Sequence, residues 1–381
     1  MLKKIPDLVH YYLNSPDRIK YVSTAYYYRL YDMVNEITKQ SSTTKEDISV
    51  ITCNFENYRK LKKGGFNVYY FYDLINFDDY EVFLKKDIVC GTPLLLLDIV
   101  NSIDYNIIQD MCRSNIKSVV FIFYDQFIPG VMNSSDSNNY FFEKFNDKLV
   151  EKPQNDSTLF NSNIAQLLNK IRAKDKLNKV FMTDNDNVKI YNVNTILPMD
   201  INITIPIITP LLSVVQKFNI KLRDHYGISD KLDRLKPVID DYMVLYQLSE
   251  CTDELGKIYV LPRGYRFKIT DVQNTFGEMS YRVFFNYETT DFEIKEVSIN
   301  ISKSFIENMY YGCEHSIMDG AYKAYFGYVL LDVLSYDNNF ESGYVVYDET
   351  KIFDLHTLYT SCLPIKKNLI VYYNLNKPIE I

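Results

Sequence analysis

The sequence lacks several residue patterns that would assign a protein to a class. It has no tryptophan, only 12 glycines and four histidines among 381 residues, and its six cysteines include no C-x-x-C pair. A zinc ribbon or a thioredoxin-type redox site is therefore not expected. No apolar run reaches the length of a membrane span or a secretory signal. We expect reduced cysteines and a cytoplasmic location, in the host cytoplasm or the virion if the chain is viral.

The glycine-rich loops that bind nucleotide phosphates are also missing. The turn after the apolar run ISVITC reads CNFENY, and the turn after Asp98 reads IVNSID; neither turn contains a glycine. A dinucleotide fold needs glycines there so that backbone amides can approach the pyrophosphate, and no G-x-x-x-x-G-K-[ST] occurs in the chain. The sequence therefore predicts no cofactor, although methyltransferase-type sites tolerate looser patterns.

Metal ligands are sparse as well. One combination can be assembled in the last third of the chain, from Cys313, His315, His356 and Cys362. Its spacings, C-x-H and H-x-x-x-x-x-C, match no standard zinc finger. Chance pairing is the simpler account, and no metal site is predicted.

Aromatic residues are abundant, with 34 tyrosines and 23 phenylalanines. A/T-rich codons favour these residues and disfavour tryptophan, which indicates an A/T-rich genome. Tyrosine also offers a large rigid surface with a polar tip, as protein interfaces use. The formal charge of −7 gives no global attraction to nucleic acid or membrane, so nucleic acid would need a local basic patch and no membrane partner is expected. The interface candidates are Tyr27, Tyr28, Tyr31, Tyr372 and Tyr373.

The first third of the chain has the pattern of a parallel α/β sheet. Continuous apolar strands at 48–53, 67–73, 93–98 and 117–124 alternate with helical stretches such as 104–114. Such strands are buried on both faces, which predicts a Rossmann-like, mostly parallel sheet. Before them, residues 16–40 show the three-and-four apolar spacing of an amphipathic helix.

The remainder is expected to be mixed, with an antiparallel sheet and helices in the C-terminal half. From 257 to 301 apolar residues alternate with a period of two, and a phase change predicts a bulge near Lys295 and Glu296. We expect a hairpin at 180–193, a strand at 201–207, helices at 209–227, 230–250 and 321–334, and further strands at 343–347 and 368–373. No internal repeat is evident. The expected domains are 1–44 (helical), 45–150 (Rossmann-like), 151–256 (mixed helical) and 257–381 (antiparallel α+β).

Two groups of residues are candidates for chemistry. Asp73, Asp98 and Asp125 each follow a predicted parallel strand, where ligands of such sheets bind, although an aspartate there can simply cap a turn. The stretch LPRGYRFKIT places Arg263, Arg266 and Lys268 beside Tyr265, a combination that suits a nucleic-acid backbone with stacked bases. The alternative is that Tyr265 and Phe267 face the core and leave the charges on a solvated edge strand.

The missing motifs and the tyrosine clusters favour a non-enzymatic structural or assembly protein, of viral type, such as a capsid or replication-complex component. The alternative is a diverged nucleotide- or nucleic-acid-dependent enzyme of methyltransferase-like fold, or its inactive stimulatory subunit. An RNA-binding component that uses the basic strand is a third hypothesis.

Overall fold

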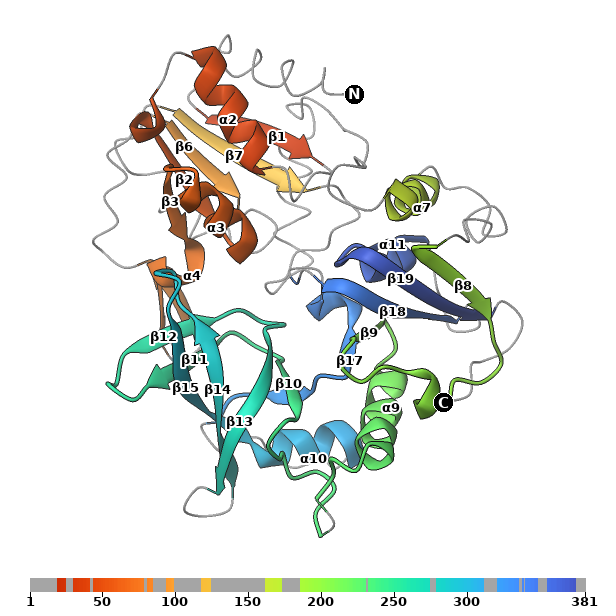
Figure 1. Ribbon diagram of the computed structural model, residues 1–381. Coiled ribbons are helices and arrows are strands. Elements are labelled where there is room, and N and C mark those ends of the chain that lie inside the picture. Colours follow the sequence, from red (N-terminus) through yellow and green to blue (C-terminus); the bar gives the residue numbers. More distant parts are fainter. Residues whose placement is uncertain are drawn as a thin grey trace. The chain divides into compact units, whose positions relative to one another are not determined.

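The chain divides into two units, residues 1–159 and 160–381, which are described separately. In the computed structural model (Figure 1) each unit is built on a parallel sheet, and the second unit also holds an antiparallel sheet. The structure describes residues 19–24, 30–41, 44–78, 81–84, 94–98, 118–124, 162–172, 186–230, 232–274, 279–311, 321–335, 338, 340–348 and 355–374.

The first unit contains a five-stranded sheet in the order β1-β7-β6-β2-β3, and every neighbouring pair is parallel. The inner strand β2 is buried along its whole length, as a strand covered on both faces requires. The predicted parallel sheet is confirmed. The elements of this unit are β1 (Ile19–Thr24), α2 (Leu30–Ser41), η1 (Lys45–Asp47), β2 (Ile48–Thr52), α3 (Phe55–Lys63), β3 (Asn67–Tyr70), α4 (Phe71–Leu74), β4 (Ile75–Asp78), β5 (Glu81–Leu84), β6 (Leu94–Asp98) and β7 (Ser118–Tyr124).

The single helix predicted over 16–40 is wrong. The structure has the strand β1 and then the helix α2, because Ile19–Thr24 pairs in parallel with β7 over its whole length. A six-residue run with isoleucine, valine and threonine suits a strand, and sheet pairing overrides the helical spacing. The helix predicted at 104–114 lies outside the described residues.

The second unit contains another five-stranded parallel sheet, in the order β17-β9-β18-β19-β8. The sequence predicted an antiparallel sheet with helices in the C-terminal half and missed this parallel sheet, in which 343–347 and 368–373 lie in parallel neighbours. Its elements and the flanking helices are α7 (Ser162–Arg172), β8 (Val188–Asn192), η3 (Pro198–Asp200), β9 (Ile207–Thr209), α9 (Leu212–His225), β17 (Val329–Leu331), η4 (Asp332–Leu334), β18 (Phe340–Asp348), α11 (Leu355–Cys362) and β19 (Ile365–Asn374).

A seven-stranded antiparallel sheet, ordered β12-β11-β15-β14-β13-β10-β16, is inserted in sequence between α9 and β17. The alternating pattern at 257–301 is thereby confirmed. The bulge lies between Ile269 and Asp271 and not near Lys295, because β15 pairs regularly with β14 and Ile294 is 73% exposed. The elements are β10 (Tyr242–Leu245), β11 (Ser249–Asp253), β12 (Ile258–Leu261), β13 (Arg266–Asn274), β14 (Ser280–Glu288), β15 (Ile294–Ser302), α10 (Lys303–Tyr311) and β16 (Ala324–Phe326).

Three further predictions for this unit are corrected. The stretch 230–250 forms turns and strands, with Asp230 and Asp233 side chains accepting from nearby backbone amides. The stretch 321–334 forms β16 and β17 in two different sheets, and both strands are buried along their whole length. At 201–206 the chain forms turns, and the short strand β9 begins at Ile207. The helix at 209–227 is confirmed as α9. For the hairpin at 180–193, only β8 is described, and it pairs in parallel with β19.

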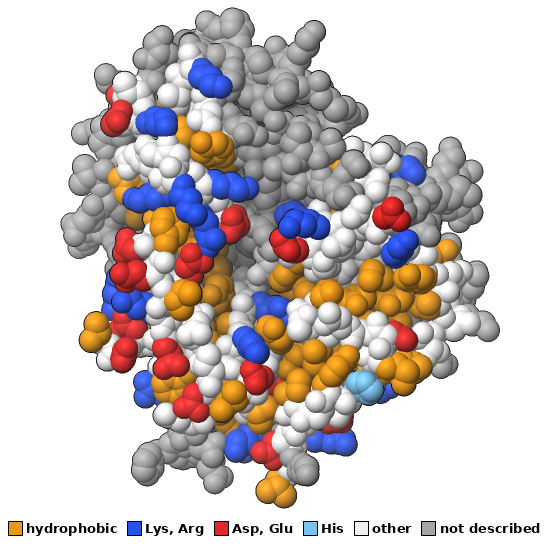
Figure 2. All heavy atoms as spheres, in the orientation of Figure 1, with side chains coloured by type: hydrophobic (Ala, Val, Ile, Leu, Met, Phe, Trp, Pro, Cys, Tyr) orange, Lys and Arg blue, Asp and Glu red, His pale blue; other side chains and the backbone are white. Residues whose placement is uncertain are grey.

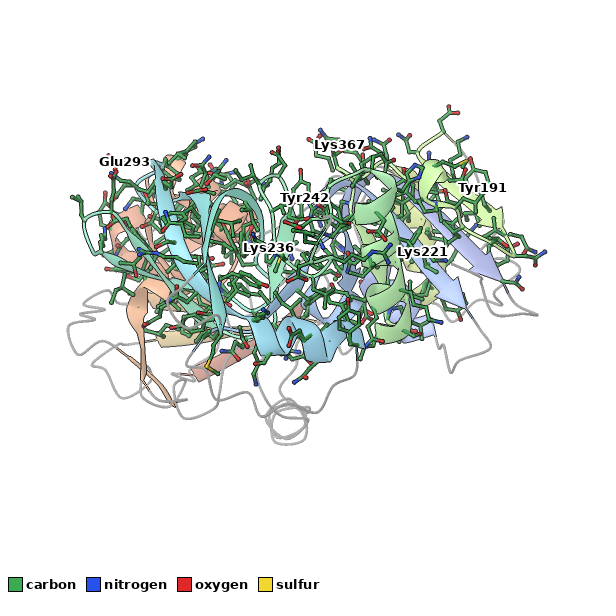
Figure 3. All side chains as sticks on the ribbon, turned by 90° about the horizontal axis from the view of Figure 1, so that it is seen from below. Tyr191, Lys221, Lys236, Tyr242, Glu293 and Lys367 are labelled. Atoms are coloured by element: carbon green, nitrogen blue, oxygen red, sulfur yellow. The ribbon has the colours of Figure 1, made fainter. Side chains whose placement is uncertain are left out.

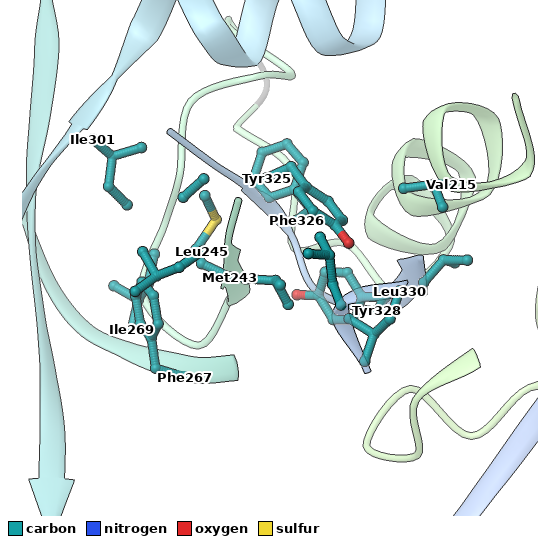
Figure 4. Packing of buried hydrophobic residues seen from close by; sticks show 14 of the residues in the cluster. Val215, Met243, Leu245, Phe267, Ile269, Ile301, Tyr325, Phe326, Tyr328 and Leu330 are labelled. Carbon is teal, nitrogen blue, oxygen red and sulfur yellow. The ribbon is translucent and has the colours of Figure 1, made fainter. Parts of the chain in front are cut away.

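A single hydrophobic core joins the antiparallel sheet of the second unit to α9 and to one face of its parallel sheet. Figure 4 shows Met243, Phe267 and Ile269 from the antiparallel sheet near Phe326 and Tyr328, with Val215 of α9 beside them. Gly327 lies in the tight turn between β16 and β17, where an added Cβ would stand 3.1 Å from the Met243 carbonyl carbon. Among the described residues, no helix combines the length and apolarity needed to cross a membrane.

The two parallel sheets share one strand order, which the sequence did not reveal. When the strands of each sheet are counted along the chain, both sheets read first-fifth-fourth-second-third from one edge. In the first unit these strands are β1, β2, β3, β6 and β7; in the second they are β8, β9, β17, β18 and β19. The chain therefore contains two α/β units of the same topology.

Candidate functional site

The strand order of the first sheet singles out one edge. The chain leaves β2 through α3 toward β3 on one side, and it leaves β6 toward β7 on the other side. Because β2 and β6 are parallel neighbours, their carboxyl ends meet, and Thr52 stands opposite Asp98 in the register. Ligands of open α/β sheets bind where the connections from neighbouring strands diverge in this way. We call this place the β2/β6 edge.

The turn that follows β2 is built from polar groups. The Thr52 hydroxyl accepts a hydrogen bond from the Asn54 backbone N–H at 3.1 Å, and Asn54 is the N-cap of α3. Its Oδ1 accepts from the Asn57 backbone N–H at 2.9 Å. Asparagine is favoured at this position because its oxygen satisfies an amide that has no partner within the helix. Thr52, Asn54 and Asn57 are all at most 2% exposed.

The other end of the Asn54 side chain has no such partner. Its Nδ2 atom is buried, and it makes no hydrogen bond with the residues that the structure describes. A buried amide left without a partner costs roughly 1–3 kcal/mol, so proteins rarely keep one without a water or a ligand. The amide lies at the positive end of the α3 dipole, which favours an oxygen with negative charge. The β2/β6 edge thus holds a hydrogen-bond donor suited to a ligand oxygen.

The corresponding turn in the second sheet has a similar backbone and different chemistry. After β9, the Thr209 hydroxyl accepts from the Leu211 backbone N–H at 3.2 Å, as Thr52 does in the first sheet. The N-cap of α9 is Leu211, which offers no side-chain cap, and the next residue, Leu212, is 45% exposed. Of the two turns, the one after β2 begins its helix with a polar side chain, and the one after β9 does not.

Helix α9 is held in place by buried polar contacts along its length. Arg223 and Asp241 form a fully buried ion pair in which Nε and Nη2 donate to the two carboxylate oxygens at 2.9 and 2.8 Å. Arg223 also donates to the carbonyls of Arg234 and Lys236, and Asp241 also accepts from the Tyr328 hydroxyl at 2.8 Å. Burial raises the pKa of the Asp241 carboxyl, and the Arg223 charge opposes that shift. With these contacts satisfied, we assign the pair a structural role.

The three candidate aspartates do not come together as a described cluster. Asp73 lies in the short helix α4, directly after β3, and is half-buried. Asp98 is the last residue of β6, and the structure describes its backbone pairing but not its side chain. Asp125 lies outside the described residues. Their participation in a site stays a prediction.

The basic strand is only partly exposed. Arg266 is half-buried, its guanidinium lies 3.8 Å from the centre of the Tyr242 ring, and its Nε donates to the Gly327 carbonyl at 2.7 Å. Burial lowers the pKa of Arg266 to about 10. Lys268 is exposed and pairs with Asp240 at 2.6 Å.

The other two residues of this group are also in contact with aromatic rings. Arg263 lies over the Tyr246 ring at 5.4 Å, and Tyr265 packs against Phe267 and Phe285. Nucleic-acid binding by this strand remains a prediction, with Lys268 as its most accessible cation.

The tyrosines expected at interfaces lie in different settings. Tyr27 and Tyr28 are outside the described residues, and Tyr31 is half-buried with its ring edge-on to Phe66. Tyr372 and Tyr373 are half-buried on β19, and their side chains point to opposite faces of the second parallel sheet. Tyr372 belongs to a row of stacked tyrosines that the sequence could not show, because its members come from three strands.

Metal chemistry finds no support among the described residues, where no three His, Cys, Asp or Glu side chains gather. Of the four residues weighed for zinc, Cys313 and His315 lie outside the described residues, as does the side chain of His356. Cys362 is fully buried, and burial raises the pKa of its thiol well above the ordinary value. A buried neutral thiol is a poor metal ligand.

The main residue that sequence reasoning missed is Asn54. It lies in the sequence CNFENY that follows β2, and asparagine before a helix is a standard N-cap signal. That signal predicts the cap. It does not predict that the Asn54 Nδ2 makes no hydrogen bond with the described residues, because this depends on what surrounds the side chain in the fold. Arg223 and Asp241 were missed because 18 residues separate them in the chain.

No known protein family matches this chain. No curated protein matches it either. Among solved structures, it is similar to a Pif1 helicase from Bacteroides in complex with ADP-AlF3 and ssDNA, at 10% identity and a TM-score of 0.49, over 97% of this chain and 91% of that chain. It is also similar to the Pif1 helicase from Candida albicans, at 12% identity and a TM-score of 0.47, over 99% of this chain and 95% of that chain. At these identities the likeness concerns fold alone, and it transfers no residue role to this chain.

These neighbours correct the function favoured by the sequence. A non-enzymatic structural or assembly protein of viral type was expected, whereas the similar structures are helicases, which are nucleic-acid-dependent enzymes. The expectation was wrong because it rested on missing motifs, and a missing motif does not exclude a fold that carries enzymes.

Proposed function

We propose that this chain is a nucleotide-dependent protein that acts on nucleic acid, either as an enzyme or as a diverged non-catalytic partner, and that it binds its nucleotide at the β2/β6 edge. The observation that supports the proposal is the buried Nδ2 of Asn54, which makes no hydrogen bond with the described residues and lies where the connections from β2 and β6 diverge.

The chemistry of the edge limits how the nucleotide is held. Without glycines in the turn, the backbone cannot form the usual phosphate cradle, so the contact is made by a side chain. An amide nitrogen donates up to two hydrogen bonds, which suits a phosphate oxygen, a ribose hydroxyl or a base carbonyl. The partial positive charge at the start of α3 favours the phosphate among these.

The chain also has a second unit with an inserted antiparallel sheet. Nucleic acid would bind to that unit, away from the nucleotide at the β2/β6 edge. Nucleotide and single-stranded DNA are also the ligands with which a Pif1 structure was solved. What supports nucleotide binding in this chain is Asn54 and the strand order, and not that likeness.

The test is a thermal-shift measurement on the full chain with ATP, ADP, GTP and S-adenosylmethionine, each with and without Mg²⁺. A ligand that binds only the folded state stabilises it by about 2.7 kcal/mol at a hundredfold excess over its Kd. We expect at least one nucleotide to raise the Tm of the wild type and to lose that effect in Asn54→Asp. The variant keeps an oxygen for the Asn57 N–H, so α3 stays capped, but it replaces the donor with a negative charge.

The matched control is Asn67→Asp. Asn67 is the first residue of β3 and lies at the amino ends of the strands, the end of the sheet opposite to Asn54. Its amide donates to the Ser49 hydroxyl at 2.8 Å. This variant should keep the nucleotide response. If no nucleotide shifts the wild type, or if both variants respond equally well, the proposed site is wrong. Nucleotide hydrolysis, measured with and without single-stranded DNA, then separates an enzyme from a non-catalytic partner.

A further inference from the structure

Three tyrosine rings form a stacked row across the second parallel sheet. Tyr344 of β18 and Tyr372 of β19 have ring centroids 6.0 Å apart and planes only 8° from parallel. Tyr372 and Tyr191 of β8 are 5.8 Å apart, with planes 28° from parallel. We call these three residues the tyrosine row.

The sheet fixes the inner part of the row. Tyr372 and Tyr191 are direct partners in the β19–β8 register, so their rings leave the same face of the sheet. Tyr344 is only 5% exposed, and its hydroxyl accepts from the Asn202 backbone N–H at 3.2 Å. Tyr372 is half-buried, and burial raises the pKa of its hydroxyl to about 12. The row is therefore preorganised before anything binds.

The outer end of the row is open. Tyr191 is 47% exposed, and Figure 3 places it on the β8 side of the second unit, among side chains at the margin. Hydrophobic side chains gather on this side of the molecule over β8, β18 and β19 in Figure 2. Leu197 and Met199, from the segment after β8, are 46% and 68% exposed. Contiguous exposed apolar surface can mark a binding site.

We propose that the outer face of Tyr191 stacks an unpaired base of a single-stranded nucleic acid, which extends the tyrosine row by one aromatic ring. A nucleobase is flat and aromatic, and it stacks on tyrosine whatever its identity. Lys189 lies two residues earlier on β8 and on the same face, about 6.6 Å along the strand, where its ammonium can meet the adjoining phosphate. The acidic chain as a whole gives no general attraction, so binding depends on this local combination.

This inference rests on the proposed function in one respect, the action on nucleic acid. It concerns a different unit and a different ligand from the β2/β6 edge. Asn54→Asp should remove the nucleotide response and leave oligonucleotide binding unchanged, whereas a variant at Tyr191 should do the reverse. Failure of one proposal is therefore visible without failure of the other.

The absence of tryptophan permits a direct experiment. The Tyr191→Trp variant of the full chain carries a single tryptophan, and a stacked base should quench its fluorescence. We expect quenching on titration with a twelve-nucleotide oligothymidylate at low salt. Tyr311→Trp is the matched control, because Tyr311 is 64% exposed on α10 and not part of the tyrosine row, and its fluorescence should not change.

Affinity is measured with a fluorescently labelled oligothymidylate by anisotropy. Tyr191→Ser should bind about fivefold to a hundredfold more weakly than the wild type, the range that loss of one stacked base gives. Tyr191→Phe should bind normally, because it keeps the ring. Equal binding by wild type and Tyr191→Ser, or no binding by the wild type, overturns the proposal. Quenching of Tyr191→Trp by thymidine monophosphate at the same concentration would overturn the single-strand part, since the site would then hold a free nucleotide.

Discussion

The two parallel sheets have the same strand order, and they use the helix after their second strand in different ways. In the first unit, α3 begins with a polar turn in which Asn54 caps the helix and keeps a buried donor for which the described residues offer no acceptor. In the second unit, α9 begins with Leu211 and Leu212 and is tied down by Asn219 and Arg223. The same topological position thus provides a candidate ligand site in one unit and an anchor in the other.

The difference follows from what each helix must support. α9 packs against β17, β9 and α10, and buried polar groups of the helix reach the insertion through Asp241 and the turn before β17. No insertion of this kind follows α3, which leads after a short turn into β3. A repeated fold can therefore keep its strand order while the polar groups at one position stabilise one copy and form only a candidate binding site in the other.

The largest effect is expected from breaking the anchor. Asp241→Ala leaves the Arg223 charge buried without its carboxylate, which should lower the free energy of unfolding of the second unit by about 3–5 kcal/mol. Urea unfolding, with hydrogen exchange followed separately in each unit, measures this. Lys268→Ala is the control, because it removes an ion pair whose side chains are 51% and 69% exposed and should change little. If Asp241→Ala lowered the free energy of unfolding no more than the control does, the Asp241 carboxylate would not stabilise the buried Arg223 charge.

A smaller effect is expected from Asn219→Ala. The Asn219 Oδ1 accepts from the backbone N–H groups of Tyr328 and Val329, at 3.1 and 2.9 Å, and the side chain is fully buried. Removing it leaves these amides without an acceptor, at a cost of about 2–3 kcal/mol in the second unit. Asn202→Ala is the control, since its exposed side chain holds only a local turn with Thr204. Equal stability of the two variants would contradict an anchoring role for Asn219.

The smallest effect is expected in the first unit. Asn54→Ala removes the acceptor for the Asn57 N–H and should lower the free energy of unfolding of the first unit by about 1 kcal/mol. The same unfolding measurement applies. If Asn54→Ala stabilised the unit, the unpartnered amide would have cost more than the cap contributes, which would sharpen the case that a ligand normally satisfies it.

Sequence patterns predicted local structure well where the pattern had one interpretation. The parallel strands β2, β3, β6 and β7 and the antiparallel β13–β15 were predicted from apolar runs and from strict alternation. Predictions failed where the apolar spacing of a segment fits a helix as well as a strand. The stretch 321–334 and the start of the chain near 19–24 look helical by spacing, but both form strands because a neighbouring strand is available to pair with them.

The candidate site was predicted less well than the fold. Asp98 was placed correctly at the carboxyl end of a parallel strand, but Asn54 and the tyrosine row were not recognised. The tyrosine row joins residues 191, 344 and 372, and no local pattern relates positions so far apart.

By itself, the sequence determined the α/β character of the first unit, the alternating strands of the insertion and the absence of a glycine-rich phosphate loop, because these depend on neighbours within a few residues. Only the tertiary structure decided that a second parallel sheet exists with the same strand order, which helix start keeps a donor without a described acceptor, and which tyrosines stack. The physical reason is that strand order, burial and ring contacts are set by residues distant in the chain, whose encounter depends on packing and not on local preference.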